Sequence, residues 1–132
     1  MSSNQMDSSS SYPANTLAPL VSIIIRSMGR PTLRQALDSV SGQYYPRLEL
    51  IVVNAKGAGH PPMPDHYNHI PLCFCSNDQP LRRSRAANRG MEQAQGDYLV
   101  FLDDDDWLLP RHISALVAAL QRQPHLRVAY AG

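Results

Sequence analysis

The sequence has little lysine, little net charge and no long apolar run, and each shortage excludes a class of protein. Lys56 is the only lysine among 12 basic residues, and the formal net charge of the 132-residue chain is +1. This balance gives no electrostatic reason to expect a nucleic-acid partner. No apolar stretch reaches the roughly 18 residues of a transmembrane helix. The N-terminus also lacks the basic and then apolar pattern of a secretory signal, so we expect a cytoplasmic protein without a transmembrane segment.

Cysteine is scarce as well, because only Cys73 and Cys75 occur. The two alternate along a short apolar segment, as residues on one face of a strand do. Zinc would need two further ligands, and none is evident nearby. We therefore expect two reduced, partly buried thiols.

Hydrophobic periodicity predicts an alternation of strands and helices. Short apolar runs predict strands at residues 20–25, 48–53, 70–75, 98–102 and 126–131. Apolar residues spaced i, i+3, i+4 and i+7 predict helices at residues 32–41, 81–95 and 111–123. Glycine and proline interrupt residues 55–69, which predicts a polar surface loop that carries three of the histidines, His60, His66 and His69.

This alternation predicts an α/β fold with a doubly wound, mostly parallel sheet. The domain should span residues 19–132, because residues 1–18 are rich in serine, asparagine and glutamine and predict a disordered leader. A fifth strand at the end of the chain would leave the sheet incomplete, with an edge available for self-association.

Polar residues follow three of the predicted strands where each strand ends. They are residues 27–30, Asn54 and the acidic run 103–106. In open α/β sheets ligands bind outside the carboxyl ends of the strands, so we expect these residues to share one site. Arg82, Arg85 and Arg89 recur at helical spacing upstream of the acids, either as a solvated basic face or as cations directed at phosphate.

The acidic run consists of four consecutive aspartates, Asp103 to Asp106. Adjacent carboxylates repel one another, and a bound Mg²⁺ or Mn²⁺ relieves that repulsion. A solvated acidic turn is the alternative. A metal held by carboxylates can neutralise a diphosphate leaving group, so transfer from a nucleoside-diphosphate donor fits this pattern.

Other known sequence motifs do not match the acidic run or the rest of the chain. An EF-hand loop starting at Asp103 would need glycine and glutamate where Leu108 and Ser114 stand. The Walker A, G-x-G-x-x-G and G-x-S-x-G patterns are absent. A phospho-acceptor domain would need acids after the first strand, which here ends in Arg26 and Ser27.

An ordered set of short motifs resembles the family 2 glycosyltransferases, which have the GT-A fold. The first part comprises the strand 21–25 and the following Arg30-Pro31 helix. The second comprises Gln43, Tyr45, Pro46, Leu48, Glu49 and the strand 51–53. The third comprises Ala86, Asn88 and Gly90, then the continuous segment 94–106 and Pro110.

The resemblance implies a role for each candidate residue. Asp103 and Asp105 match the family's Asp-x-Asp, with Asp105 and Asp103 as ligands of Mn²⁺ or Mg²⁺ and Asp103 or Asp104 contacting the donor ribose. The residues implied to bind the rest of the nucleotide sugar, expected to be a UDP-sugar, are Ser27, Arg30, Asn54, Arg82 and Arg85. The acceptor would be a saccharide or lipid-linked molecule of polysaccharide biosynthesis.

Four departures from the family pattern accompany this resemblance. Arg26-Ser27 replaces the usual Pro-Thr, Asn54 replaces an aspartate, and Ala87 replaces an arginine. The family's catalytic base would lie beyond Gly132, so we expect no catalytic residue in this chain. The alternative is therefore a truncated, catalytically inactive module for nucleotide-sugar binding or interaction.

Overall fold

The computed structural model describes residues 18–122 and the backbone of residues 128–130. The predicted leader, residues 1–18, lies outside the described residues except for Ala18, which is buried in the core. The last predicted strand, residues 126–131, is described at residues 128–130 alone.

The described residues form a six-stranded sheet in the order β4-β5-β3-β2-β6-β7. Its strands are β2 (Val21–Ser27), β3 (Leu48–Asn54), β4 (His66–Tyr67), β5 (Ile70–Cys75), β6 (Tyr98–Asp103) and β7 (Val128–Tyr130). All neighbouring strands are parallel except β4 and β5. The predicted doubly wound, mostly parallel sheet is therefore confirmed, with the two-residue β4 added inside the segment that was expected to be loop.

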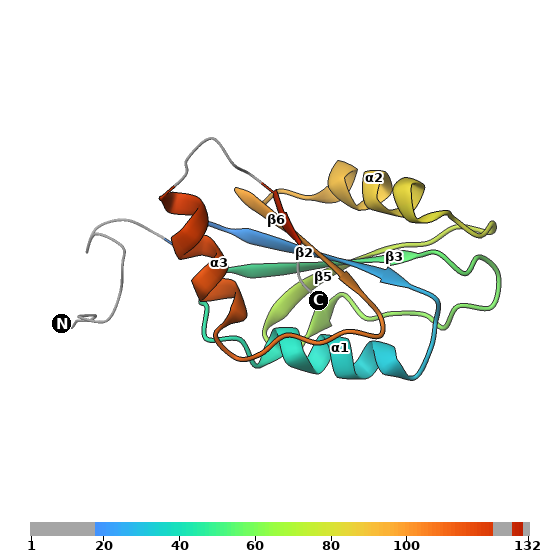
Figure 1. The fold of residues 1–132 in the computed structure, drawn as a ribbon. Coiled ribbons are helices and arrows are strands. Elements are labelled where there is room, and N and C mark those ends of the chain that lie inside the picture. Colours follow the sequence, from blue (N-terminus) through green and yellow to red (C-terminus); the bar gives the residue numbers. More distant parts are fainter. Residues whose placement is uncertain (1–17, 123–127, 131–132) are drawn as a thin grey trace.

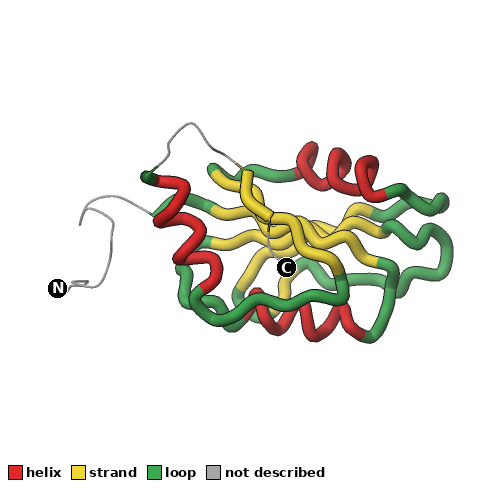
Figure 2. The backbone as a smooth tube through the Cα atoms, viewed as in Figure 1, coloured by secondary structure: helices red, strands yellow, loops and turns green. Residues whose placement is uncertain are grey.

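Among the described residues, three helices cover the two faces of the sheet (Figures 1 and 2). They are α1 (Thr32–Ser41), α2 (Arg83–Gln93) and α3 (His112–Gln121). Helix α2 lies over one face and α1 over the other (Figure 1). α3 shares the face of α1, because its Ile113 and Val117 belong to the same buried cluster as Leu37 and Val40 of α1.

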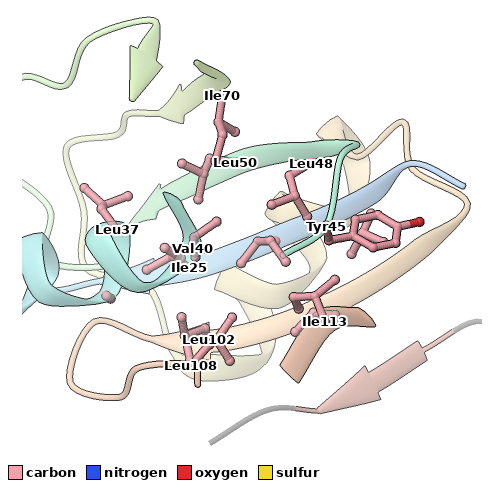
Figure 3. Packing of buried hydrophobic residues seen from close by; sticks show 14 of the residues in the cluster. Ile25, Leu37, Val40, Tyr45, Leu48, Leu50, Ile70, Leu102, Leu108 and Ile113 are labelled. Atoms are coloured by element: carbon pink, nitrogen blue, oxygen red, sulfur yellow. The ribbon is translucent and has the colours of Figure 1, made fainter. Parts of the chain in front are cut away.

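The larger part of the core lies between the sheet and helices α1 and α3. Ile25, Leu50 and Leu102 project into it from three adjacent strands (Figure 3). A smaller cluster on the α2 face consists of Ile24, Ile51, Val53, Ala55, Cys75 and Ala86. Successive residues of a strand point to opposite faces, so the near-continuous apolar runs of β2 and β3 serve both clusters.

Helix α2 packs unusually close to the sheet because Gly90 lacks a side chain. A Cβ atom at this position would overlap the Cγ2 methyl of Ile24 and lie 3.3 Å from Cγ2 of Val53. This close contact fixes the height of α2 above the sheet. It thereby sets where the first residues of α2 stand relative to the ends of β2 and β6.

Gln43 joins the end of α1 to the segment that follows the acidic run. Its Nε2 donates to the carbonyl of Leu109 at 2.6 Å, and its Oε1 accepts from the backbone N–H of Ile113 at 2.9 Å. The side chain is buried. It therefore holds the connection between β6 and α3 in place, and with it the downstream side of the site.

Candidate functional site

The carboxyl ends of β2 and β6 bring Arg26 beside Asp103. The two residues are register partners in the parallel pair, so their side chains emerge on the same face of the sheet, the face covered by α2. The Nη1 of Arg26 lies 3.9 Å from Oδ1 of Asp103. Arg83, the first residue of α2, donates from its Nη1 to Oδ2 of Asp103 at 2.6 Å. Asp103 therefore receives one guanidinium from a strand and a second from a helix.

A turn after β6 gathers three of the four acids. The backbone N–H of Asp106 donates to the carbonyl of Asp103 at 3.2 Å, which folds the chain back on itself. One carboxylate oxygen each from Asp103, Asp105 and Asp106 then lies within 4.8 Å of the other two. Carboxylates held so close repel one another, and oxygen ligands of this type suit Mg²⁺ and Mn²⁺. These three residues could hold such an ion.

Asp104 points away from that group and stabilises the local structure. Its side chain is fully buried, and its Oδ2 accepts from the backbone N–H of Met28 at 2.7 Å. Its Oδ1 accepts from Nε of Arg30 at 3.0 Å and also from Nη2. The hydrogen bond and the negative charge of Asp104 raise the pKa of Arg30. Asp104 therefore ties the end of β6 to the turn after β2.

A hollow of about 580 Å³ opens between the start of α2 and the ends of β2 and β6. Its floor and walls are apolar at Ile24, Ala86, Ala87, Phe101 and Leu102. Its charged lining consists of Arg26, Arg82, Arg83, Asp103 and Asp106. The Nε of Arg26 is buried there without a hydrogen-bond partner among the described residues. A space with an apolar wall, several guanidiniums and an acidic rim is suited to a phosphorylated ligand with a bound cation.

Ser27 lies at the predicted edge but is buried and already hydrogen-bonded. Its Oγ is 2.6 Å from Nε2 of His60 and accepts from the backbone N–H of Gly29 at 3.1 Å. The Nδ1 of His60 lies 2.7 Å from the carbonyl of Pro61, which can only accept. A neutral His60 therefore donates from Nδ1 and accepts from Ser27 at Nε2.

Asn54 is similarly engaged within the protein. Its Oδ1 accepts from the backbone N–H groups of Lys56 and Gly57 at 2.9 and 3.0 Å, and its Nδ2 donates to the carbonyls of Gly57 and Asn77 at 2.9 and 3.3 Å. The side chain shapes the loop that follows β3. Contact of Ser27 or Asn54 with a nucleobase stays a prediction.

The remaining predicted arginines take different positions. Arg82 lines the hollow, immediately before α2, while Arg85 is exposed and outside the lining. Arg30 is committed to Asp104. The structure thus brings Arg82, Asp103 and Asp105 to one region, and it leaves Ser27 and Asn54 as internal supports of neighbouring loops.

The sequence did not predict Arg83 as a residue of the site, and it placed Asp106 at the site without a role as a metal ligand. Arg83 falls between the positions of the arginine stripe, although its place at the start of a helix was a usable signal. Asp106 belongs to the acidic run, but only the turn geometry shows that its carboxylate returns toward Asp103.

The parallel α/β sheet with acids at the end of β6 defines a GT-A-like domain. The sequence profile of Glycosyl transferase family 2 matches residues 22–131, so the chain belongs to that family. It is 30% identical over 102 residues to the glycosyltransferase YwdF of Bacillus subtilis, an alignment that covers 76% of this chain and 38% of YwdF. It is 29% identical over 120 residues to the O-antigen biosynthesis protein RfbC of Myxococcus xanthus, covering 85% of this chain and 9% of RfbC.

Solved structures of other proteins have a similar fold over part of their length. The mannosyltransferase PcManGT of Pyrobaculum calidifontis, solved with GDP-Man and Mn²⁺, superposes with a TM-score of 0.65 at 24% identity, covering 83% of this chain and 34% of that protein. TarS of S. aureus, residues 1–349 with UDP-GlcNAc, gives a TM-score of 0.64 at 18% identity, covering 78% and 31%. The chain spans between 30% and 38% of the length of three curated relatives it matches. Among the described residues, no helix combines the length and apolar character needed to cross a bilayer.

Proposed function

We propose that this domain binds a nucleoside-diphosphate sugar together with Mn²⁺ or Mg²⁺, as the donor side of a glycosyl transfer reaction. The observation that carries the proposal is the convergence of Asp103, Asp105 and Asp106 at the rim of an arginine-lined hollow. Membership of Glycosyl transferase family 2 supports the reaction class. The solved relatives that hold UDP-GlcNAc, or GDP-Man with Mn²⁺, support the class of donor.

The proposed roles follow from exposure and existing bonds. Asp105 is exposed and Asp106 half-buried, so both can turn an oxygen toward a cation, with Asp103 as the third ligand. The ion would supply positive charge to the diphosphate, where negative charge grows as the bond to the sugar breaks. Arg82 and Arg83 would contact phosphate oxygens, for which a planar guanidinium is well suited. Asp104 would hold the turn after β2 rather than touch the ribose, since both its oxygens already accept hydrogen bonds.

The expected donor is a UDP-sugar, the acceptor is a saccharide or a lipid-linked molecule, and the expected location is the cytoplasm. RfbC, named for O-antigen biosynthesis, supports a role in polysaccharide assembly. A nucleotide-sugar-binding module without turnover is the second candidate. Self-association through the edge at β7 stays a prediction.

Titration calorimetry with UDP, GDP and dTDP, each with and without Mn²⁺, tests the proposal. We expect at least one nucleotide to bind in the presence of Mn²⁺ and to bind at least tenfold more weakly without the ion, because the ion bridges carboxylates and phosphates. Absence of Mn²⁺-dependent binding for all three would contradict a donor site. Release of free sugar from the matching donor, lost in Asp105→Ala, then separates an enzyme from a binding module.

A further inference from the structure

The carboxylate of Asp103 has two guanidinium neighbours within the protein. Arg83 donates to one of its oxygens at 2.6 Å, and Arg26 stands 3.9 Å from the other. A cation that uses Asp103 must therefore compete with at least one guanidinium. The hydrogen bond to Asp103 and the charges of Asp103, Asp105 and Asp106 raise the pKa of Arg83, so its positive charge is favoured beside the acids.

The two arginines differ in how easily their side chains can move away from Asp103. The side chain of Arg83 is 71% exposed, whereas that of Arg26 is 22% exposed. Arg26 belongs to β2 and is hydrogen-bonded through its backbone to neighbouring segments, including the N–H of Asp104. Arg83 stands at the exposed start of α2, so it can move aside at little cost in packing, while Arg26 stays.

Charge balance also indicates that a divalent cation should bind to this site together with an anion. In the described part of the chain, the hollow and its rim hold three guanidiniums, from Arg26, Arg82 and Arg83. They face three carboxylates, from Asp103, Asp105 and Asp106. Since these charges cancel, a dication by itself would leave the site with an excess of positive charge. A diphosphate that arrives with the ion restores the balance.

We infer that Arg83 is an exchangeable counter-ion, paired with Asp103 when the site is empty and transferred to the diphosphate when the metal takes Asp103. The inference rests on the proposed function and deepens it. It makes Arg83 responsible for part of the coupling between the two ligands. By thermodynamic linkage, the metal and the diphosphate raise each other's binding affinity by the same factor. The metal alone should bind weakly because it must first displace Arg83.

The test compares Arg83→Gln with Arg82→Gln in the full chain. Both variants remove one positive charge from the same hollow, but no hydrogen bond or ion pair to Asp103 is found for Arg82 among the described residues. Mn²⁺ binding is followed by electron paramagnetic resonance of the free ion, first alone and then with inorganic pyrophosphate, a diphosphate without a nucleobase. Circular dichroism checks that both variants are folded.

For Arg83→Gln we expect Mn²⁺ alone to bind about three- to fivefold more tightly, the gain from removing an exposed competing ion pair. With pyrophosphate the gain should disappear, because the diphosphate has lost its guanidinium partner. Arg82→Gln should change the affinity for Mn²⁺ alone by less than about twofold, since only screened charge is removed.

Equal gains in the two variants, or unchanged Mn²⁺ affinity in Arg83→Gln, would overturn the exchange while leaving a Mn²⁺–diphosphate site in the wild type intact. If the wild type binds Mn²⁺ neither alone nor with pyrophosphate or UDP, the proposed function fails and the exchange fails with it. The two failures are thus distinguishable by the behaviour of the wild type.

Discussion

At the scale of single residues, neighbouring acids of the same run have opposite surroundings. Asp104 is fully buried and accepts hydrogen bonds from Met28 and Arg30, whereas Asp105 is exposed. No hydrogen bond is found for the Asp105 side chain among the described residues. Removal of these two identical side chains, one position apart, is therefore expected to affect different properties of the protein.

Replacement by alanine should separate stability from binding. Asp104→Ala should lower the free energy of unfolding by about 2 kcal/mol, because the Met28 N–H loses a charged, buried acceptor. Asp105→Ala should change it by less than about 0.5 kcal/mol, as expected at an exposed position, while weakening Mn²⁺ binding about tenfold or more. Urea unfolding and Mn²⁺ titration of the two variants measure both quantities. A large stability loss in Asp105→Ala, or none in Asp104→Ala, would contradict this division.

The sequence predicted that the acidic run lies at the site, but it did not predict that Asp104 is structural while Asp105 is exposed. Strand alternation places Asp103 on the α2 face, and continuing that alternation would send Asp104 to the other face. That signal was present, but the run leaves the strand at this point, and the turn that returns Asp106 toward Asp103 depends on three-dimensional packing. Arg83 was missed because its partner lies 20 residues away in the chain.

At the scale of elements, the placement of α2 depends on Gly90. The residue lies in the interior of the helix, where glycine lowers helix stability, yet its missing side chain lets α2 approach Ile24 and Val53. The helix carries Arg83 at its first position, so the height of α2 above the sheet and the geometry of the hollow are linked.

Gly90→Ala should therefore destabilise the protein. The overlap with Ile24 should cost about 1–3 kcal/mol, which exceeds the gain of at most about 1 kcal/mol in helix propensity. Gly42→Ala is the matched control, because a Cβ there would meet only the carbonyl of Asp38 at 3.5 Å and the φ angle of −88° suits any residue. Thermal unfolding measures both variants. Equal melting temperatures would show that α2 can shift without cost.

The elements themselves were largely predictable. The helix predicted at residues 32–41 is α1 without change, and the strand at 70–75 is β5. The other described strands and helices differ from their predicted bounds by one or two residues at most ends, where local propensity is weakest. β4 escaped prediction because a two-residue strand has no periodicity to detect.

At the scale of the whole molecule, stability should fall in alkaline solution. Burial, and then the neighbouring Cys73, raise the pKa of Cys75 from 9.0 to about 11. Burial, and then the hydrogen bond to Asp38, also raise the pKa of Tyr67. Since both groups hold their protons more tightly when folded, their contribution is complete below the unfolded pKa values and is lost as the pH rises through the folded ones.

The free energy of unfolding should therefore drop between about pH 9 and pH 11, by about 2 kcal/mol for Cys75. Urea titrations at pH 8, 9, 10 and 11 measure this decline. The variant Cys75→Ala should start from a lower stability but show a shallower decline, because the contribution of Cys75 is removed and that of Tyr67 is kept. A decline of unchanged steepness in Cys75→Ala would assign the alkaline effect to other groups.

The buried carboxylate of Asp104 has a consequence for how sequences of this kind are searched and engineered. A pattern written Asp-x-Asp leaves its middle position open, which suggests that any residue can be encoded there. In this chain that position accepts hydrogen bonds on both oxygens, so a library randomised at codon 104 and selected for stability should be enriched in aspartate. The position that the pattern leaves open would therefore be under selection for stability, whereas Asp105 would be under selection for binding.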